Sequence, residues 1–226
     1  MDFSLRNQKI AESRWRKTID REKYYFLETK EAKILKSLLC GMLCGDGSVQ
    51  VRKEKQYSHY QLDFFPDDKR MAEVYCLILQ RVYNKQPTVK KEKSYFSVRL
   101  TSRSVVEDLL QITSYGIKAW RVPSSLFFTD VNKKAWLQGF FSAEAYVSAK
   151  QIKLQTVNEE GMRQVSQLLT EIGIRHKFYL YIPKLPNCSP VYIIMINSKE
   201  DRKRFYAEVG FCHTKKMNQL RKSLGL

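Results

Sequence analysis

One nine-residue pattern occurs twice in this chain, and the repeat limits what the chain can fold into. The first copy is LCGMLCGDG at residues 39–47, and the second is LQGFFSAEA at residues 137–145. Both read Leu, any residue, Gly, apolar, apolar, small, small, acid, small. The copies lie 98 residues apart, a period too long for one unit of a solenoid. The repeat therefore predicts two similar halves in one chain.

Each copy ends an apolar run with helical spacing, as in Leu35, Leu38, Leu39, Met42 and Leu43. Small residues recur within both runs at a four-residue step. They are Gly41 and Gly45 in the first run, and Gly139 and Ala143 in the second. Glycine inside a helix costs about 1 kcal/mol relative to alanine. We infer that the cost is offset by close approach of the two helix backbones about a pseudo-twofold axis.

An acid stands near the end of each copy, Asp46 in the first and Glu144 in the second. Both acids fall at the C-terminal end of a predicted helix, where the helix dipole already carries partial negative charge. Two such ends side by side favour a cation between them, and oxygen ligands suit Mg²⁺. Either acid alone would be read as a solvated residue that ends an ordinary core helix. The matched pair favours the cation site.

The two stretches resemble the paired motifs of the LAGLIDADG homing endonucleases, in the single-chain form with two motifs. The resemblance extends from about residue 31 to about residue 222. It implies an α+β fold of two pseudo-symmetric αββαββα halves, with antiparallel saddle-shaped sheets and the paired motif helices at the centre. Ala145 stands where the family usually has glycine, and Cys44 and Ser142 stand where it often has aspartate.

The resemblance also implies a metal site. Metal ligation is expected at Asp46 and Glu144 and at the preceding residues Gly45 and Ala143. Mg²⁺ is the expected cofactor, Mn²⁺ is expected to substitute, and Ca²⁺ is expected to support DNA binding without cleavage. Lysines late in each half are candidates for stabilising transition-state charge or orienting water: Lys118, Lys215 and Lys216. Each has an ordinary surface lysine as its alternative.

The repeat divides the chain into a basic N-terminal extension (residues 1–30), a first half (31–115), a linker (116–131) and a second half (132–226). The extension is basic and aromatic at residues 14–17 and 21–25, and we expect it to be helical. Two interpretations of it stay open. It contacts the DNA backbone, or it is a surface helix packed on the first half.

Alternating polar and apolar residues after each motif predict hairpins with one buried face. The expected strands are 48–53, 57–65, 88–92 and 95–101 in the first half, and 146–150, 151–157, 175–182 and 191–196 in the second. The expected helices are 69–83, 104–114, 158–172 and 199–209, with Asp68, Asn158 and Ser198 near their starts. A last basic segment, 215–221, follows.

The outward residues of these strands form a polar, net basic set. They are Gln50, Arg52, His59, Gln61, Asp63, Arg99, Gln151, Lys153, Gln155, Lys177, Tyr179 and Tyr181. Arg and Lys can read guanine, Gln can read adenine, and Asp can accept a hydrogen bond from cytosine. Alternation by itself is equally compatible with a solvated sheet face. The glutamines and the charge of the chain favour DNA contact.

Charge narrows the class of partner. Lys and Arg number 40 against 23 Asp and Glu, a net charge of +17, which favours a polyanion. No apolar run approaches the roughly 18 residues of a membrane span, so no membrane partner is expected. The N-terminus has no signal-peptide pattern, which predicts an intracellular protein. The five cysteines are odd in number and form no C-x-x-C, as expected for free thiols.

We therefore expect a monomeric, site-specific double-strand DNA endonuclease of the intron-encoded kind, with a long asymmetric target. The rival classes are an intron RNA-splicing maturase and a DNA-binding regulator that does not cleave. The two intact acids favour the nuclease. An excised intein is disfavoured because residue 1 is neither Cys nor Ser and no terminal His-Asn is seen.

Overall fold

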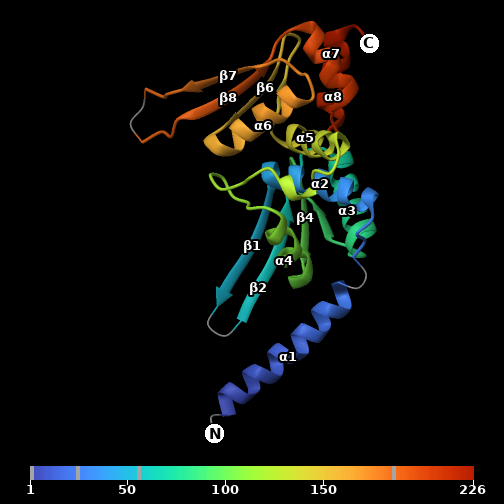
Figure 1. Ribbon diagram of the computed structural model, residues 1–226, viewed down its shortest axis with the longest axis vertical. Helices are drawn as coiled ribbons and strands as arrows, with labels where there is room; N and C mark the ends of the chain where they lie inside the picture. The colour runs from blue at the N-terminus through green and yellow to red at the C-terminus, as the bar shows by residue number, and fades with distance from the viewer. Residues whose placement is uncertain (1–2, 24–25, 55–56, 185–186) are drawn as a thin grey trace.

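The computed structural model describes residues 3–23, 26–54, 57–184 and 187–226. Two similar halves lie on either side of a central pair of helices, and a long N-terminal helix extends from the first half (Figure 1). Tyr24 and Tyr25, part of the basic and aromatic N-terminal stretch, lie outside the described residues, as does the side chain of Trp15.

The order of elements repeats from one half to the other. The N-terminal helix is α1 (Phe3–Lys23). The first half follows as α2 (Lys30–Asp46), β1 (Gly47–Glu54), β2 (Tyr57–Phe64), α3 (Lys69–Tyr83), β3 (Thr88–Lys91), β4 (Phe96–Thr101) and α4 (Arg103–Ile112). After the short helix η1 (Ser124–Leu126), the second half runs as α5 (Asp130–Glu144), β5 (Tyr146–Val147), β6 (Ile152–Thr156), α6 (Glu159–Glu171), β7 (Lys177–Tyr181), β8 (Val191–Ile196) and α7 (Lys199–Glu208). The final helix is α8 (Thr214–Leu224).

Both sheets have the same topology. Their strand orders are β1-β2-β4-β3 and β5-β6-β8-β7, and all neighbouring strands are antiparallel. The predicted α+β fold of two αββαββα halves is confirmed. The terminal basic segment differs from expectation in forming a helix of its own, α8, which begins at the N-cap residue His213.

Helix starts follow the capping residues in the sequence. Asp68, Asn158 and Ser198 each accept a hydrogen bond from a backbone N–H three residues on, the usual arrangement at a helix N-cap. Ser102 does the same for α4, so this helix begins at Arg103 rather than at residue 104. Strand β5 is shorter than predicted because the Ser148 N–H donates to the Gln151 carbonyl at 2.9 Å and closes a turn. Gln151 consequently lies just before β6.

The small residues of the motifs lie where α2 and α5 touch. A Cβ on Gly41 would lie 2.2 Å from the carbonyl oxygen of Trp136, and one on Gly139 would lie 2.3 Å from that of Leu38. A Cβ on Gly45 would lie 2.4 Å from the Cβ of Ala143. These gaps are too short for any side chain, so the predicted close approach of the two backbones is confirmed.

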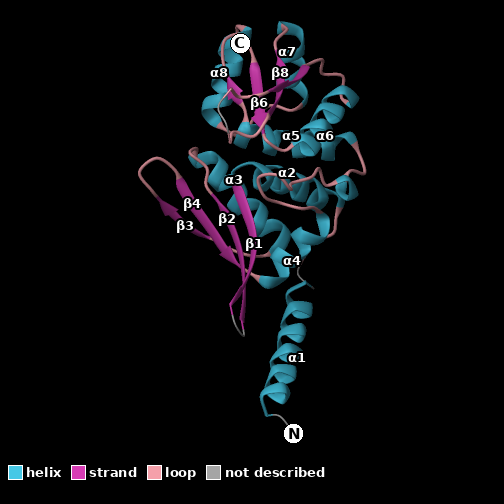
Figure 2. Cartoon of the chain, turned by 90° about the vertical axis from the view of Figure 1, so that its left-hand side faces the viewer, coloured by secondary structure: helices cyan, strands magenta, loops and turns pink. Residues whose placement is uncertain are grey.

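The core fills the space between the sheets and the helices. In the first half, α3 and α4 pack on one face of the sheet (Figure 2), where Leu62, Phe64 and Val98 are fully buried. The other face of each sheet carries the polar residues predicted to face outward. Within the described residues, no helix has the length and apolar character needed to cross a membrane.

Candidate active site and nucleic-acid interface

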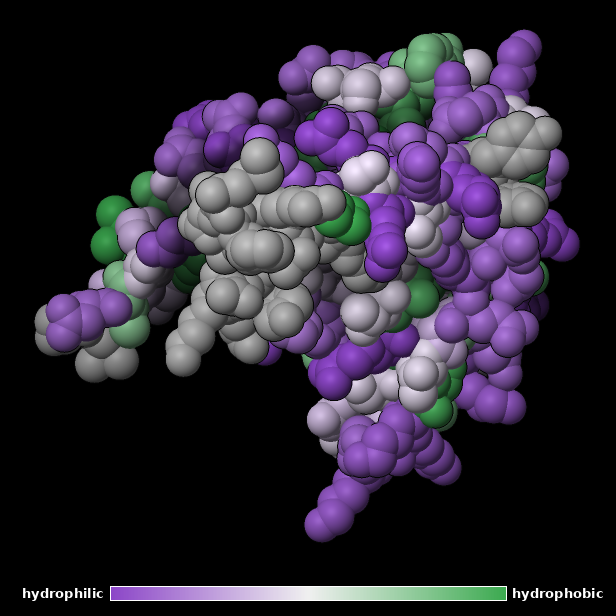
Figure 3. All heavy atoms as spheres, turned by 90° about the horizontal axis from the view of Figure 1, so that it is seen from below, coloured by the Kyte–Doolittle hydropathy of each residue, from purple (hydrophilic) through white to green (hydrophobic). Residues whose placement is uncertain are grey.

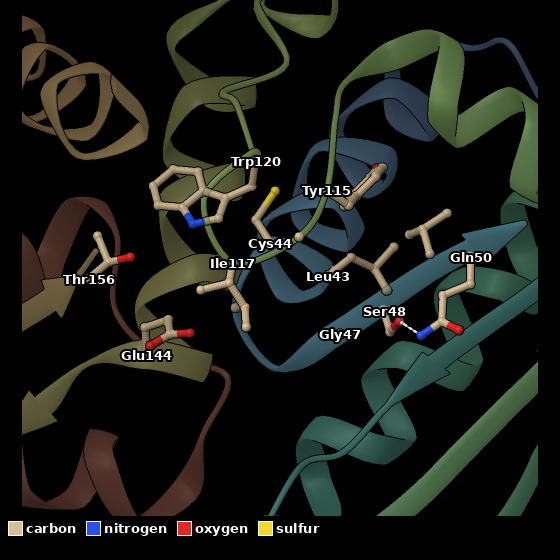
Figure 4. A pocket seen from close by; sticks show the side chains of 13 residues that line it. Leu43, Cys44, Gly47, Ser48, Gln50, Tyr115, Ile117, Trp120, Glu144 and Thr156 are labelled. Atoms are coloured by element: carbon tan, nitrogen blue, oxygen red, sulfur yellow. Dashed lines mark hydrogen bonds between the residues drawn. The ribbon is translucent and has the colours of Figure 1, made fainter. Parts of the chain in front are cut away.

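The two motif acids end the two central helices. Asp46 is the last residue of α2, and Glu144 is the last residue of α5. Glu144 lies on a pocket of about 480 Å³. Figure 4 shows Glu144 and Thr156 on one side of this pocket, Ser48 and Gln50 on the other, and Ile117 between them. The pocket therefore draws residues from both halves and lies at the junction between them.

Both carboxyl groups are less acidic than usual. The surrounding protein raises the pKa of Glu144 to about 7, with a second contribution from the Asp46 carboxylate, while Lys216 opposes the shift. Burial also raises the pKa of Asp46, and Asp67 adds to the rise, whereas Lys216 and His213 oppose it. Two carboxylates that repel each other at negative helix ends form a place that favours a cation.

A cationic side chain already lies at this place. The Lys216 ammonium donates to the carbonyl oxygens of Ser142 at 2.7 Å and Ala143 at 2.6 Å. Burial lowers the pKa of Lys216, and the carboxylates of Asp46, Asp67, Glu144 and Asp68 offset part of that shift. The carbonyls at the end of α5 thus bind a positive charge, and the donor set of carbonyl and carboxylate oxygens fits a hard divalent ion.

The other candidate lysines lie elsewhere. Lys118 donates to the hydroxyl of Ser189, in the loop between β7 and β8, at 3.2 Å. Lys215 is exposed on α8. Of the three candidates, Lys216 is therefore the one that the structure brings to the motif acids. The catalytic role of all three stays a prediction.

A contact between the halves borders the acids and has no counterpart in the sequence predictions. His213, buried at the start of α8, lies with Nε2 3.0 Å from an Asp67 carboxylate oxygen. The backbone N–H of Thr214 donates to the Asp68 carboxylate at 3.2 Å, and within the second half the Cys212 N–H donates to the Ser142 hydroxyl at 2.8 Å. These bonds join residues that are 70 or more positions apart, so no local pattern could have revealed them.

Most of the predicted DNA-reading residues lie on the open faces of the sheets. Gln50 pairs with Gln61 and Arg52 with His59 across β1 and β2. Asp63 differs from the rest of the predicted set because it is buried, with only 3% of its surface exposed. Arg99 Nε donates to it at 2.7 Å and Gln61 Nε2 at 2.5 Å. Asp63 therefore holds two neighbouring side chains in position.

The open faces also contain residues that the sequence analysis did not assign to DNA contact. Strand pairing places Ser48, Thr88, Lys90 and Ser97 beside the predicted set in the first sheet, and Tyr146, Val191, Ile193 and Met195 in the second. The sequence of β8 does not alternate between polar and apolar residues, because both faces of this strand are apolar, so its outward residues could not be recognised from the sequence. In the described part of the chain, no three His, Cys, Asp or Glu residues converge as a metal cluster.

Comparisons with known proteins agree with this architecture. Residues 132–210 match the family model of the LAGLIDADG-like domain. A structure described as mesophilic variants of the homing endonuclease I-DmoI superimposes with a TM-score of 0.64 at 16% identity, covering 79% of this chain and 96% of that one. I-DmoI in complex with DNA and Mn gives a TM-score of 0.62 at 18% identity, with 79% and 97% covered. Residues 132–210 thus resemble a LAGLIDADG-like domain, and the chain has the fold of the I-DmoI structures.

Further similarity reaches other kinds of protein. The chain is 25% identical to a DNA polymerase of Methanocaldococcus jannaschii over 90% of its own length, but it spans only 13% of that polymerase. Full-length DUF199/WhiA from Thermatoga maritima has a TM-score of 0.55 at 14% identity, with 90% of this chain and 64% of that one covered. The fold is therefore found both in the homing endonuclease I-DmoI and in DUF199/WhiA.

Proposed function

We propose that this protein is a site-specific double-strand DNA endonuclease that depends on a divalent metal ion. The observation that carries the proposal is the pairing of Asp46 and Glu144 at two helix ends between two open sheet faces of equal topology. Solved complexes of I-DmoI contain DNA with Mn or Ca, and a variant complex was solved in the presence of Mg. These support a divalent ion and duplex DNA as partners of the same fold.

In the proposed reaction the protein positions the DNA backbone at the junction of the halves. Asp46 and Glu144 would hold the metal, together with the backbone around Gly45 and Ala143. Bound Mg²⁺ supplies Lewis-acid stabilisation of charge on the reacting phosphate. Lys216 contributes a fixed positive charge at the end of α5, close enough to influence both carboxylates. The open sheet faces select the site through the major groove.

The test is a cleavage selection on a randomised duplex library with Mg²⁺, and in parallel a binding selection with Ca²⁺. Sequence-specific double-strand cuts with Mg²⁺ are expected. Asp46→Asn and Glu144→Gln should each lower cleavage by about 10²-fold or more, with duplex binding retained. Glu200→Gln, which changes an exposed acid on α7, is the matched control and should cleave normally. Cleavage at the wild-type rate by Glu144→Gln would refute the assignment of this residue.

A non-cleaving outcome also has a meaning. Tight duplex binding in Ca²⁺ with no cutting in Mg²⁺ or Mn²⁺ would indicate a DNA-binding protein without nuclease activity. Preference for a structured RNA over the duplex, measured at the same salt concentration, would move the proposal away from DNA altogether. The salt concentration must be held constant because phosphate contacts dominate both affinities.

A further inference from the structure

The two open sheet faces can be compared residue by residue. In each half the first strand begins just after the motif acid, so positions can be counted from that acid. Two residues after Asp46 comes Ser48, which pairs with Asp63. Asp63 pairs with Arg99, and Arg99 with Thr88. These four residues form a row across the first sheet. We call it the first-sheet row: Ser48, Asp63, Arg99 and Thr88.

The second sheet has the corresponding row. Two residues after Glu144 comes Tyr146, which pairs with Lys153. Lys153 pairs with Met195, and Met195 pairs with Lys177. This second-sheet row is Tyr146, Lys153, Met195 and Lys177. By this correspondence, Met195 occupies the position that Arg99 has in the first sheet.

The next row of each sheet shows the same difference, with polar residues in the first sheet and an apolar residue at the centre of the second. Ser97 pairs with Lys90 in the first sheet. In the second sheet Ile193 pairs with Gln155 on one side and Tyr179 on the other. Beyond it, Val191 pairs with Tyr181. The centre of the second open face is therefore an apolar strip along β8, in which Val191 and Met195 are partly exposed on either side of the buried Ile193, with two tyrosines alongside.

The projecting β7–β8 arm has exposed apolar side chains on both faces, since Leu180 and Ile182, 47% and 68% exposed, alternate with the outward Tyr179 and Tyr181. Seen from below, the arm extends to the left and carries hydrophobic side chains (Figure 3). Tyr179 and Tyr181 are 39% and 54% exposed, and Val191 and Met195 are partly exposed. Lys153 and Lys177 lie on either side of Met195, at one end of the strip, where their charges suit a DNA backbone. Apolar side chains that continue from a pair of cations fit a partner that carries apolar groups next to phosphates.

We infer that the two halves read their half-sites by different chemistry. The first sheet offers hydrogen-bonding groups, with Arg99 held by Asp63 at 2.7 Å, and this suits guanine and adenine edges in the major groove. The second sheet offers an apolar strip, and the apolar group that the major groove presents is the C5 methyl of thymine. The half-site of the second sheet is consequently rich in thymines that are recognised through their methyl groups. The inference rests on the proposed function, because it needs a specific duplex target.

Deoxyuridine tests this directly, since it pairs as thymine does but lacks the methyl group. The probe is the duplex selected by cleavage, with dU replacing dT in one half-site at a time. Affinity in Ca²⁺ should fall about fourfold for each contacted methyl in the second half-site. The same number of replacements in the first half-site is the control and should have little effect. Equal tolerance, or equal loss, in both half-sites would overturn the inference while leaving specific cleavage intact.

A row exchange provides the second measurement and identifies which half-site each sheet reads. The double variant Lys153→Asp/Met195→Arg copies the Asp63–Arg99 pair into the second sheet. Its selected target should change from thymine to guanine at one position of the dU-sensitive half-site. The matched control is Lys199→Asp/Lys203→Arg on α7, which changes exposed residues to the same two types. An unchanged target in the row-exchange variant would count against the inference, whereas a wild-type protein with no specific target would refute the proposed function itself.

Discussion

The Lys216 ammonium lies 2.6 Å from the carbonyl oxygen of Ala143, one residue before Glu144. This charge opposes the rise in the pKa of both motif acids. In Lys216→Met the pKa of Glu144 should therefore rise further, and protons should compete with a divalent ion up to higher pH. Calorimetric titration with Ca²⁺ between pH 6 and 8 should show the binding midpoint shifted to higher pH. Lys215→Met changes the exposed neighbour and should leave the midpoint where it is.

Glu144 makes the stability of the metal-free protein depend on pH. Its pKa rises from 4.5 in the unfolded chain to about 7 in the folded one, so the neutral carboxyl favours the folded state. This contribution is fully present below about pH 4.5 and is lost as the pH rises through about 7. In EDTA, Glu144→Gln should unfold at higher urea than the wild type at pH 8, and the difference should shrink toward pH 5. Ca²⁺ should stabilise the wild type at pH 8 more than the variant.

The contact between α2 and α5 permits no side chain at Gly41 or Gly139. A Cβ at either position would overlap backbone atoms of the other helix at 2.2–2.3 Å, and backbone cannot move aside as a flexible side chain can. Gly41→Ala and Gly139→Ala should each lower the free energy of unfolding by about 3 kcal/mol or more, measured by urea denaturation. Gly116→Ala is the comparison. It has open space around it but a φ of +106°, so about 1–2 kcal/mol is expected from backbone strain alone.

Asp63 is expected to act on specificity through its neighbours. It holds Arg99 and Gln61 by short hydrogen bonds, so Asp63→Ala would leave both side chains free to adopt other rotamers. Selection on a randomised library should then show relaxed base preference at the positions that these two residues cover, with non-specific affinity nearly unchanged. Lys90→Ala changes an exposed basic residue of the same open face and should weaken binding without relaxing preference. Unaltered base preference in Asp63→Ala would show that Asp63 does not position its neighbours.

Exposed basic residues on α1 allow the two interpretations of the N-terminal extension to be tested. The helix extends beyond strands β1 and β2 in both ribbon views (Figures 1 and 2), and among its described side chains Ile19 is the buried one. Three exposed basic residues lie along one side of it, at spacings of three and four: Arg14, Lys17 and Arg21. If α1 contacts the DNA backbone, neutralising these three should lower the slope of log Kd against log salt by about 2–3.

The measurement uses a random-sequence duplex in Ca²⁺, with the three residues changed together to Gln. The matched control removes the same charge from exposed lysines of α7 and α8: Lys199, Lys203 and Lys222. An equal slope in both variants would favour the surface-helix interpretation. In that case the Glu22–Lys85 ion pair, 2.8 Å long, and Ile19 would be the features that join α1 to the first half.

Much of the fold follows from short-range patterns. A small residue at every fourth position predicted the helix contact, because a helix brings residues four apart onto one face. Alternation predicted the hairpins and most of their outward residues, because successive side chains of a strand point to opposite faces. The capping residues Asp68, Asn158 and Ser198 set helix starts for an equally local reason, since their side chains bond N–H groups three residues away.

The candidate site depends in part on distances that no local pattern contains. Lys118, Lys215 and Lys216 are alike in sequence, and only the position of α8, which packs against α7 and β5, brings Lys216 to the Ala143 carbonyl. Burial of Asp63 depends on Arg99, a partner 36 residues away on another strand. The strip on β8 stayed hidden because its two faces are both apolar, and only pairing with β6 and β7 shows which face is open. Sequence alone therefore determined most of the elements, the two motif acids and their symmetry. Tertiary packing decided which charge neutralises those acids and what chemistry each open face presents, because both depend on contacts between segments far apart in the chain.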